Sequence, residues 1–250
     1  LSGKGNGLVD NLVFVHGFMG GGAQWAEQCT VFQDRFRVIT PDLPGFSEKC
    51  HMTAPEHIEE YARSILKELS DSGVHHFHLV GHSMGGMIVQ EMARLSPQSI
   101  NRLILYGTGP VGVLPGRFEP ISESKKRVAE NGPLATGQRI AATWFMKGEQ
   151  AKGYQLSADL AAKASLQAMQ AGLSAMEKWS GTKALPHIKS PALVLWGDGD
   201  RTYPWSQPEQ LWKNIPNASL AVIPGCAHAV HLEKPDLFNA VLLDFLENRG

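Results

Sequence analysis

Short apolar segments alternate with longer amphipathic ones along this chain, and this alternation limits the possible folds more than any other feature. The apolar segments cover residues 12–15, 37–40, 77–80, 103–106, 192–196 and 220–223. Helical spacing of apolar residues appears between them, at 24–36, 55–69, 84–95, 207–212 and 235–247. Strands separated by helices pair in parallel, with helices covering both faces of the sheet. We therefore predict an α/β fold with a mostly parallel central sheet.

One long segment interrupts this rhythm. Residues 108–186 carry no strand signal: they open with a Gly/Pro-rich loop and continue with helical stretches near 135–146 and 154–179. An insertion of this size between two strands must lie over one edge of the sheet. We expect residues 1–107 and 187–250 to form the core, and residues 108–186 to form an inserted helical cap, or lid.

Composition excludes several kinds of partner. The 250 residues are 43% hydrophobic and carry a formal net charge of -1, so the chain can bury one sizeable core but offers no basic surface for nucleic acid. No apolar run approaches the ~20 residues that cross a bilayer, and we expect no membrane partner. Cys29, Cys50 and Cys226 cannot all pair and lack metal-type spacing. We interpret them as buried thiols in a reducing, cytoplasmic setting.

The strongest chemical signal is Gly81-His82-Ser83-Met84-Gly85, which lies between an apolar strand and an amphipathic helix. A serine in this context sits on a tight, strained turn with its Oγ exposed above the strand ends. Glycines two residues before and after it leave room for crossing backbone. We predict Ser83 to be a nucleophile; an inert turn between strand and helix is the alternative.

A serine hydroxyl needs a base to remove its proton, and the base needs a carboxylate to fix its tautomer. His228 follows the last expected strand and is the preferred base, with His231 as its rival. Asp200 and Asp198 both follow the strand at 192–196. We prefer Asp200 and interpret Asp198 as a turn former, because Asp-Gly is a common turn pair.

Further residues complete the expected site. The backbone N–H groups of Phe18 and Met84 are the predicted oxyanion donors, since strand ends supply such groups without side-chain rearrangement. His16, Trp144, Met169 and Leu173 are candidates for lining a substrate pocket, although packing between helices explains the apolar ones equally well. The histidines at 75, 76 and 78 lack neighbouring carboxylates. We predict no metal and no cofactor.

Taken together, these motifs resemble the α/β-hydrolase family. The resemblance rests on residues 12–18, 41–47, 81–86 and 197–200, and on His228 followed by Glu233 and Pro235, in the family's order. Within the family the chain is similar to small capped carboxylesterases, 3-oxoadipate enol-lactonases and meta-cleavage-product C–C hydrolases. C–C hydrolases often have Trp directly after the base, where this chain has Ala229. Lyase-type relatives of menaquinone synthesis typically have Arg directly after the glycines that follow the serine, where this chain has Met87.

The resemblance implies a serine hydrolase that works through an acyl-enzyme on Ser83. A carboxylesterase acting on a small-molecule ester or lactone is the leading interpretation. Hydrolysis of an enol-lactone or of a C–C bond in a vinylogous diketone is the enzymatic alternative. A receptor-like ligand-binding protein with little turnover represents a different class. Substrate identity and oligomeric state stay open at this point.

Overall fold

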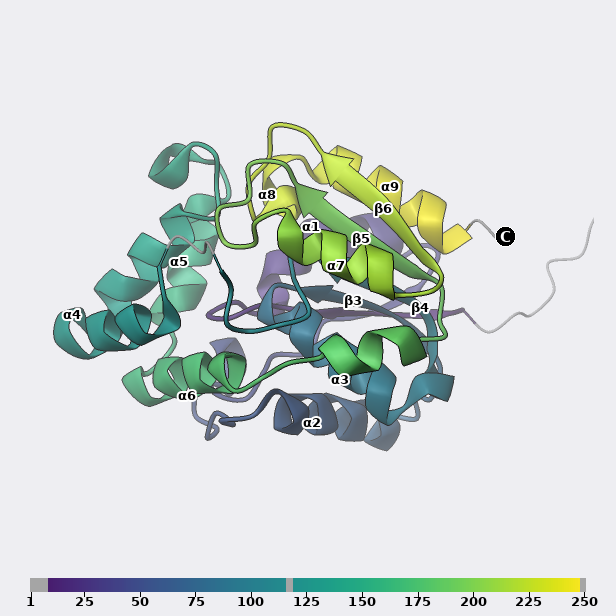
Figure 1. Cartoon of the computed structure of the whole chain (residues 1–250), viewed down its shortest axis with the longest axis horizontal. Coiled ribbons are helices and arrows are strands. Elements are labelled where there is room, and N and C mark those ends of the chain that lie inside the picture. The colour runs from purple at the N-terminus through teal and green to yellow at the C-terminus, as the bar shows by residue number, and fades with distance from the viewer. Residues whose placement is uncertain (1–8, 116–118, 248–250) are drawn as a thin grey trace, which may run out of the picture.

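A computed structural model of the chain describes residues 9–115 and 119–247. Its sheet has six strands in the order β2-β1-β3-β4-β5-β6, and every neighbouring pair is parallel (Figure 1). The strands are β1 (Asn11–Val15), β2 (Arg37–Ile39), β3 (Phe77–His82), β4 (Ile100–Tyr106), β5 (Ala192–Gly197) and β6 (Ala218–Ile223). The predicted α/β architecture is confirmed.

Helices cover both faces of this sheet. They are α1 (Ala26–Phe32), α2 (Ile58–Asp71), α3 (Met84–Leu95), α7 (Ser206–Asn214), α8 (Val230–Glu233) and α9 (Pro235–Glu247). Short 3₁₀ turns lie at η1 (Gly22–Trp25), η2 (Ser47–Lys49), η3 (Pro97–Ser99), η4 (Gly148–Gln150) and η5 (Thr182–His187).

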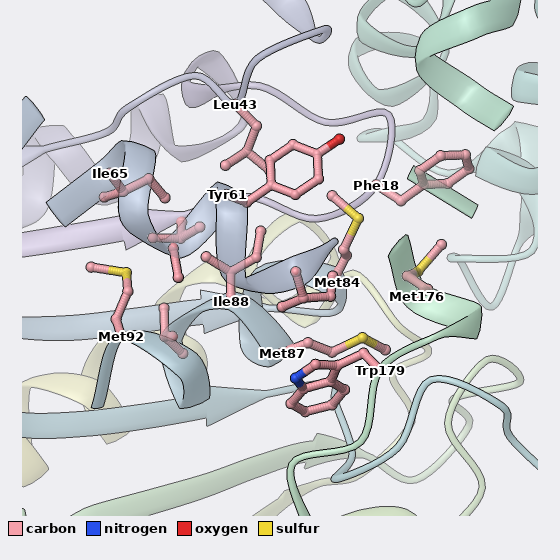
Figure 2. Close-up of a cluster of buried hydrophobic side chains, with 14 of the residues drawn as sticks. Phe18, Leu43, Tyr61, Ile65, Met84, Met87, Ile88, Met92, Met176 and Trp179 are labelled. Carbon is pink, nitrogen blue, oxygen red and sulfur yellow. The ribbon is translucent and has the colours of Figure 1, made fainter. Parts of the chain in front are cut away.

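Two hydrophobic cores form because successive strand residues point to opposite faces. Val13 and Leu79 pack with α2 and α3 on one face, whereas Phe14 and Val80 pack with α1 and α9 on the other. Figure 2 shows the first core, where Ile88 of α3 and Tyr61 of α2 are labelled among its buried side chains. Because the inner strands β1, β3, β4 and β5 are largely buried on both faces, their sequences read as nearly continuous apolar runs.

The segment between β4 and β5 is helical and lies beyond one end of the sheet (Figure 1). It contains α4 (Ile121–Ala142), α5 (Tyr154–Ala162) and α6 (Leu166–Glu177). α4 is broken at Gly132, whose φ of 79° and ψ of 164° are not helical, so it consists of two helical segments. The expected helix near 135–146 corresponds to the second segment, which ends at Ala142, whereas the first, from Ile121, was not expected. The single stretch expected at 154–179 is two helices: Ser165 starts a new one by accepting a hydrogen bond from Ala168 N at 3.1 Å.

Two expectations drawn from composition can be compared with the fold. In the part of the chain that the structure describes, no helix is both long and apolar enough to cross a membrane. The three cysteines are unpaired, but they are not all buried: Cys226 is buried, Cys29 is half-buried and Cys50 is exposed. The interpretation of Cys50 as a buried thiol was wrong, because the residue lies in the turn region after η2.

The turn from β3 into α3 leaves no room for a Cβ atom at two glycines. A Cβ on Gly85 would lie 2.4 Å from the carbonyl oxygen of Val15, and one on Gly81 would lie 2.5 Å from that of Gly85. Backbone atoms cannot yield as a flexible side chain can. The close crossing of β1, β3 and α3 therefore requires glycine at both positions.

We predict that Gly85→Ala destabilises the protein by about 3 kcal/mol or more, because backbone must move to admit the methyl group. Gly73→Ala is the matched control: a Cβ there meets nothing within 4 Å, and only the positive φ of 73° opposes it. The control should cost about 1 kcal/mol. Urea unfolding measures both free energies, and equal costs would contradict the crowding argument.

Candidate active site

Ser83 occupies the tight turn between β3 and α3. Its backbone has φ 57° and ψ −120°, a conformation that L-residues rarely adopt. Its N–H donates to Tyr106 O at 3.0 Å, and its carbonyl oxygen accepts from Thr108 Oγ1 at 2.8 Å. These bonds to the end of β4 and the loop after it hold the strained turn in place.

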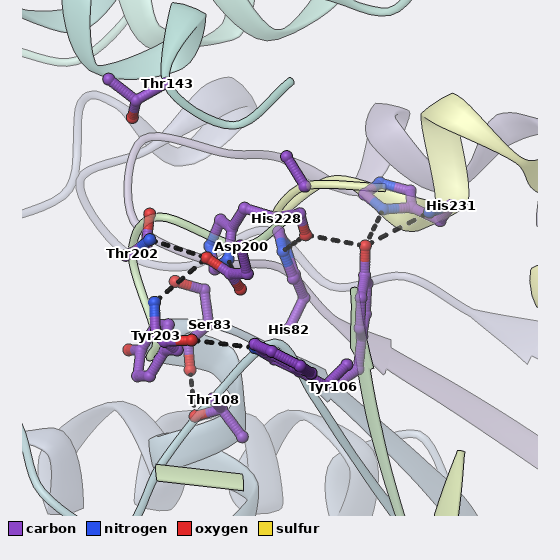
Figure 3. A network of polar contacts seen from close by, with 12 residues as sticks. His82, Ser83, Tyr106, Thr108, Thr143, Asp200, Thr202, Tyr203, His228 and His231 are labelled. Carbon is purple, nitrogen blue, oxygen red and sulfur yellow. Dashed lines mark hydrogen bonds and ion pairs between the residues drawn. The ribbon is translucent and has the colours of Figure 1, made fainter. Parts of the chain in front are cut away.

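His228 and Asp200 form a buried pair in the loops after β6 and β5 (Figure 3). The His228 Nδ1 lies 2.8 Å from Asp200 Oδ2. The other oxygen, Oδ1, accepts from the backbone N–H groups of Thr202 at 2.7 Å and Tyr203 at 3.0 Å. A carboxylate with these partners is fixed in orientation, and it holds the imidazole by one nitrogen.

The rival residues lie elsewhere. Asp198 accepts from Gly225 N at 2.7 Å through Oδ1, which ties two loops together. The Nδ1 of His231 lies 3.0 Å from Tyr106 Oη, and its Nε2 lies 3.4 Å from Gln24 Nε2. Of the two candidate carboxylates and the two candidate histidines, the structure therefore pairs Asp200 with His228.

Ser83 and the free nitrogen of His228 face a common space. Both residues line it, and His228 Nε2 is buried without a hydrogen-bond partner among the described residues. No hydrogen bond joins Ser83 Oγ to this nitrogen in the described part of the chain. Such contacts are often long without a substrate and shorten when one binds.

The two predicted oxyanion donors are also unpaired. Neither Phe18 N nor Met84 N donates a hydrogen bond to any described residue. Met84 is the first residue of α3, where N–H groups have no partner inside the helix. Phe18 and Ser83 line the same space, so the two donors flank the serine from β1 and from α3.

Two narrow compartments meet at Ser83, with cavity volumes of only about 10 and 20 Å³, so each has room for about one water molecule. The polar compartment is lined by Gly17, Phe18, Gln24, His82, Ser83, Trp144, Ser157, His228, Ala229, His231 and Leu232. The apolar compartment is lined by Phe18, Ser83, Gly112, Leu114, Ile140, Trp144, Met176, Thr202 and Tyr203. Among the described residues, neither lining contains Lys, Arg, Asp or Glu.

The predicted pocket residues divide between these linings and the protein interior. Trp144 lines both compartments. Met169 and Leu173 line neither and are buried in the first core. His16 also lines neither: its Nδ1 lies 2.8 Å from Gly17 O, and its Nε2 accepts from Leu43 N at 3.0 Å. Gln24 was not singled out from the sequence, because no motif marks it.

The inserted segment touches the loop that carries His228. Ala229 N donates to Trp144 O at 2.9 Å, and the Trp144 ring lies 6.0 Å from the His228 ring. Glu233 accepts from Met146 N at 2.7 Å with one oxygen and from Ala227 N at 2.6 Å with the other. One carboxylate therefore links the inserted segment to the backbone next to His228.

Three further histidines near the site are held neutral by burial. Burial lowers the pKa of His16 to about 4 and that of His231 to about 3. Burial also lowers the pKa of His82 well below its usual value, and the nearby His228 and His231 lower it further. Charging any of these rings would require an ion in a dry interior.

No cluster of three or more His, Cys, Asp or Glu side chains suited to a metal ion occurs within residues 9–115 and 119–247. A strained serine, a carboxylate-held imidazole and unpaired backbone donors at one edge of a parallel sheet are the arrangement typical of α/β hydrolases.

Comparisons with known proteins agree with this class. A model of the alpha/beta hydrolase family matches residues 12–241, and the chain belongs to that family. It is similar to a 2-hydroxy-6-oxo-6-phenylhexa-2,4-dienoate hydrolase of Burkholderia cepacia, with 32% identity over 85% of this chain and 78% of the relative. The resemblance inferred from sequence motifs is confirmed, and the protein is placed among hydrolases.

Solved structures with the same fold include enzymes with different substrates. An esterase from Thermogutta terrifontis superposes with a TM-score of 0.85 at 24% identity, covering 96% of this chain and 90% of the esterase. An enol-lactonase from Burkholderia xenovorans superposes with a TM-score of 0.88 at 21% identity, covering 98% of this chain and 94% of the lactonase. At these identities the likeness establishes the fold alone.

The neutral histidines give a prediction about stability. Because folding lowers the pKa of His16 and His231, the unfolded chain takes up protons below about pH 6.5 that the folded chain does not. The free energy of unfolding should therefore fall as the pH drops, by about 2 kcal/mol per such histidine between about pH 6.5 and 5. Urea unfolding at the two pH values measures this loss.

His231→Gln provides the comparison, since an amide does not titrate. The variant should lose less stability than the natural protein over this range, by about one histidine's share. A free energy of unfolding that is equally dependent on pH in both proteins would refute the assignment to His231.

Proposed function

We propose that this protein hydrolyses a carboxylic ester through an acyl-enzyme on Ser83. The observation that carries the proposal is the His228–Asp200 pair at 2.8 Å, whose free imidazole nitrogen faces the same space as Ser83. A base held by one nitrogen and free at the other is what an unactivated hydroxyl needs.

The proposed reaction proceeds in two halves. Ser83 Oγ attacks the acyl carbon while His228 Nε2 takes its proton, and Asp200 stabilises the resulting imidazolium. The N–H groups of Phe18 and Met84 stabilise the negative charge on the former carbonyl oxygen. The tetrahedral adduct then expels the alcohol, which takes the proton from His228. Water, deprotonated by the same imidazole, releases the acid and restores Ser83.

The uncharged linings favour a neutral ester over an anionic substrate. A carboxylate brought into a closed space needs a cationic partner, or it loses its hydration without compensation. The described residues that line the compartments supply hydroxyl, amide, imidazole and apolar groups. The apolar lining beside Leu114, Ile140 and Met176 matches an uncharged acyl chain, which the narrow compartment must widen to admit.

Hydrolysis of a C–C bond next to a ketone is the second candidate, and the relatives favour it. Besides the Burkholderia cepacia protein, a 2-hydroxy-6-oxononadienedioate/2-hydroxy-6-oxononatrienedioate hydrolase of Comamonas testosteroni matches at 29% identity over 85% of this chain. The same serine, imidazole and backbone donors would serve either bond. Ala229 and the uncharged linings weigh against this candidate.

We predict that Ser83→Ala lowers hydrolysis of short p-nitrophenyl esters by a factor of at least about 10³, because the covalent step is lost. Ser96→Ala, at the end of α3, is the matched control and should keep full activity. Steady-state assays and labelling with a serine-directed phosphonate measure the outcome. Unchanged turnover in the Ser83 variant, or labelling at another residue, would end the proposal.

A substrate panel separates the candidate functions. Many turnovers per minute on neutral esters, with slow cleavage of enol-lactones and dienoate diketones, is the expected result. The reverse order of rates would establish the lactone or C–C alternative. Ligand-induced stabilisation without turnover on any of them would indicate a binding protein.

A further inference from the structure

The backbone carbonyl of His228 accepts two hydrogen bonds from buried side chains. Tyr106 Oη donates to this oxygen at 2.9 Å, and His82 Nε2 lies 3.0 Å from it. Tyr106 ends β4, the strand between those that lead to Ser83 and Asp200, and His82 directly precedes Ser83. The rings of His82 and Tyr106 stack with centroids 4.5 Å apart (Figure 3).

These contacts determine which ring nitrogen of His82 carries the proton. A carbonyl oxygen only accepts, so His82 Nε2 must carry a hydrogen. Because burial keeps this ring neutral, its Nδ1 is then an acceptor. Gln24 Nε2 lies 3.5 Å from that nitrogen and can donate to it.

The same reasoning fixes His231. The amide nitrogen of Gln24 also lies 3.4 Å from His231 Nε2, which must accept because the amide nitrogen only donates. The neutral ring of His231 therefore carries its proton on Nδ1, which donates to Tyr106 Oη at 3.0 Å. The hydroxyl of Tyr106 has one hydrogen, and it is left for the carbonyl of His228.

A single set of protons therefore satisfies the whole network. Reversing the Gln24 amide would place an oxygen against His82 Nδ1, and this ring, whose Nε2 already donates to the His228 carbonyl, would need a second proton in a buried site. Tyr106 Oη also accepts from His231 N at 3.2 Å, so its acceptor capacity is filled. Each hydrogen in the network has one acceptor to which it is donated, and each ring nitrogen is either a donor or an acceptor.

We propose that Tyr106 and His82 are positioning residues, which fix His228 through its backbone carbonyl, and that Gln24 sets the tautomers this requires. The proposal rests on the proposed function, in which His228 is the base. The side chain of His228 is fixed by Asp200, and its neighbours Ala227 and Ala229 donate to Glu233 and to Trp144 O. The hydrogen bonds from Tyr106 and His82 to its carbonyl oxygen hold the backbone of His228 on the side that faces β3 and β4.

This role differs from simple packing because it depends on hydrogen-bond donors and not on ring volume. Phenylalanine at position 82 or 106 would keep an aromatic ring in the stack and remove one donor to the carbonyl. His228 would keep its partner Asp200 but gain freedom of movement relative to Ser83. The expected consequence is a slower chemical step with little change in substrate binding.

Nitrogen NMR of the imidazole rings tests the tautomers without reference to activity. We expect His82 to carry its proton on Nε2 and His231 on Nδ1, with both rings neutral from about pH 8 to 5. Signals are assigned with the His82→Phe and His231→Gln variants. Detection of the opposite tautomer at either ring, or of a charged ring in this range, would overturn the proposal.

Kinetics tests the positioning role. Tyr106→Phe and His82→Phe should each lower kcat about 5- to 30-fold, as expected for one lost hydrogen bond that aligns a catalytic group, and should leave KM within about twofold. Tyr61→Phe is the matched control: the Tyr61 hydroxyl is buried in the first core and has no partner among the described residues. Its removal should leave kcat unchanged.

The outcomes distinguish this proposal from the proposed function. If Ser83→Ala is inactive and both donor variants keep full kcat, the positioning role is wrong and the hydrolase assignment stands. If Ser83→Ala keeps its activity, the assignment of His228 as base fails and the positioning role fails with it. Should either donor variant fold poorly, as judged by its melting temperature, the tautomers measured in the natural protein still decide the question.

Discussion

The site depends on one buried contact, the hydrogen bond between His228 Nδ1 and Asp200 Oδ2. An unpaired carboxylate in this interior would cost several kcal/mol, so its other oxygen must also be satisfied. The backbone N–H groups of Thr202 and Tyr203 meet that need. The pair therefore requires a loop after β5 that turns back on the carboxylate, and a loop after β6 that brings the imidazole to it.

Parallel strand order supplies both loops. The carboxyl ends of β3, β4, β5 and β6 lie side by side at one edge of the sheet, so residues that follow each strand meet there. Ser83 follows β3, and Tyr106 closes β4. The proposed catalytic groups and the groups that position them thus come from consecutive strands of one sheet, although His82 and His228 are 146 positions apart.

Much of this arrangement was predictable from the sequence, because its signals are local. Apolar runs mark the strands, and the glycines around Ser83 mark a turn that only glycine permits. The Asp-Gly turn pair at Asp198 then favoured Asp200 as the carboxylate. The inserted segment was harder: the helical segment between Ile121 and Gly132 and the break before the helix at Ser165 depend on contacts with other elements, which helical spacing does not report.

The network around Gln24 was beyond sequence reasoning for a different reason. Its hydrogen bonds join residues 58 and 207 positions apart, and glutamine at position 24 has no distinctive neighbour pattern. The distances place its amide nitrogen within hydrogen-bond reach of both His82 and His231. Burial lowers the pKa of each of these rings and keeps both neutral. A polar group buried beside a reactive centre is costly unless every donor has an acceptor. The agreement of all the proton assignments here indicates that the floor of the site holds His228 in a single orientation before a substrate arrives.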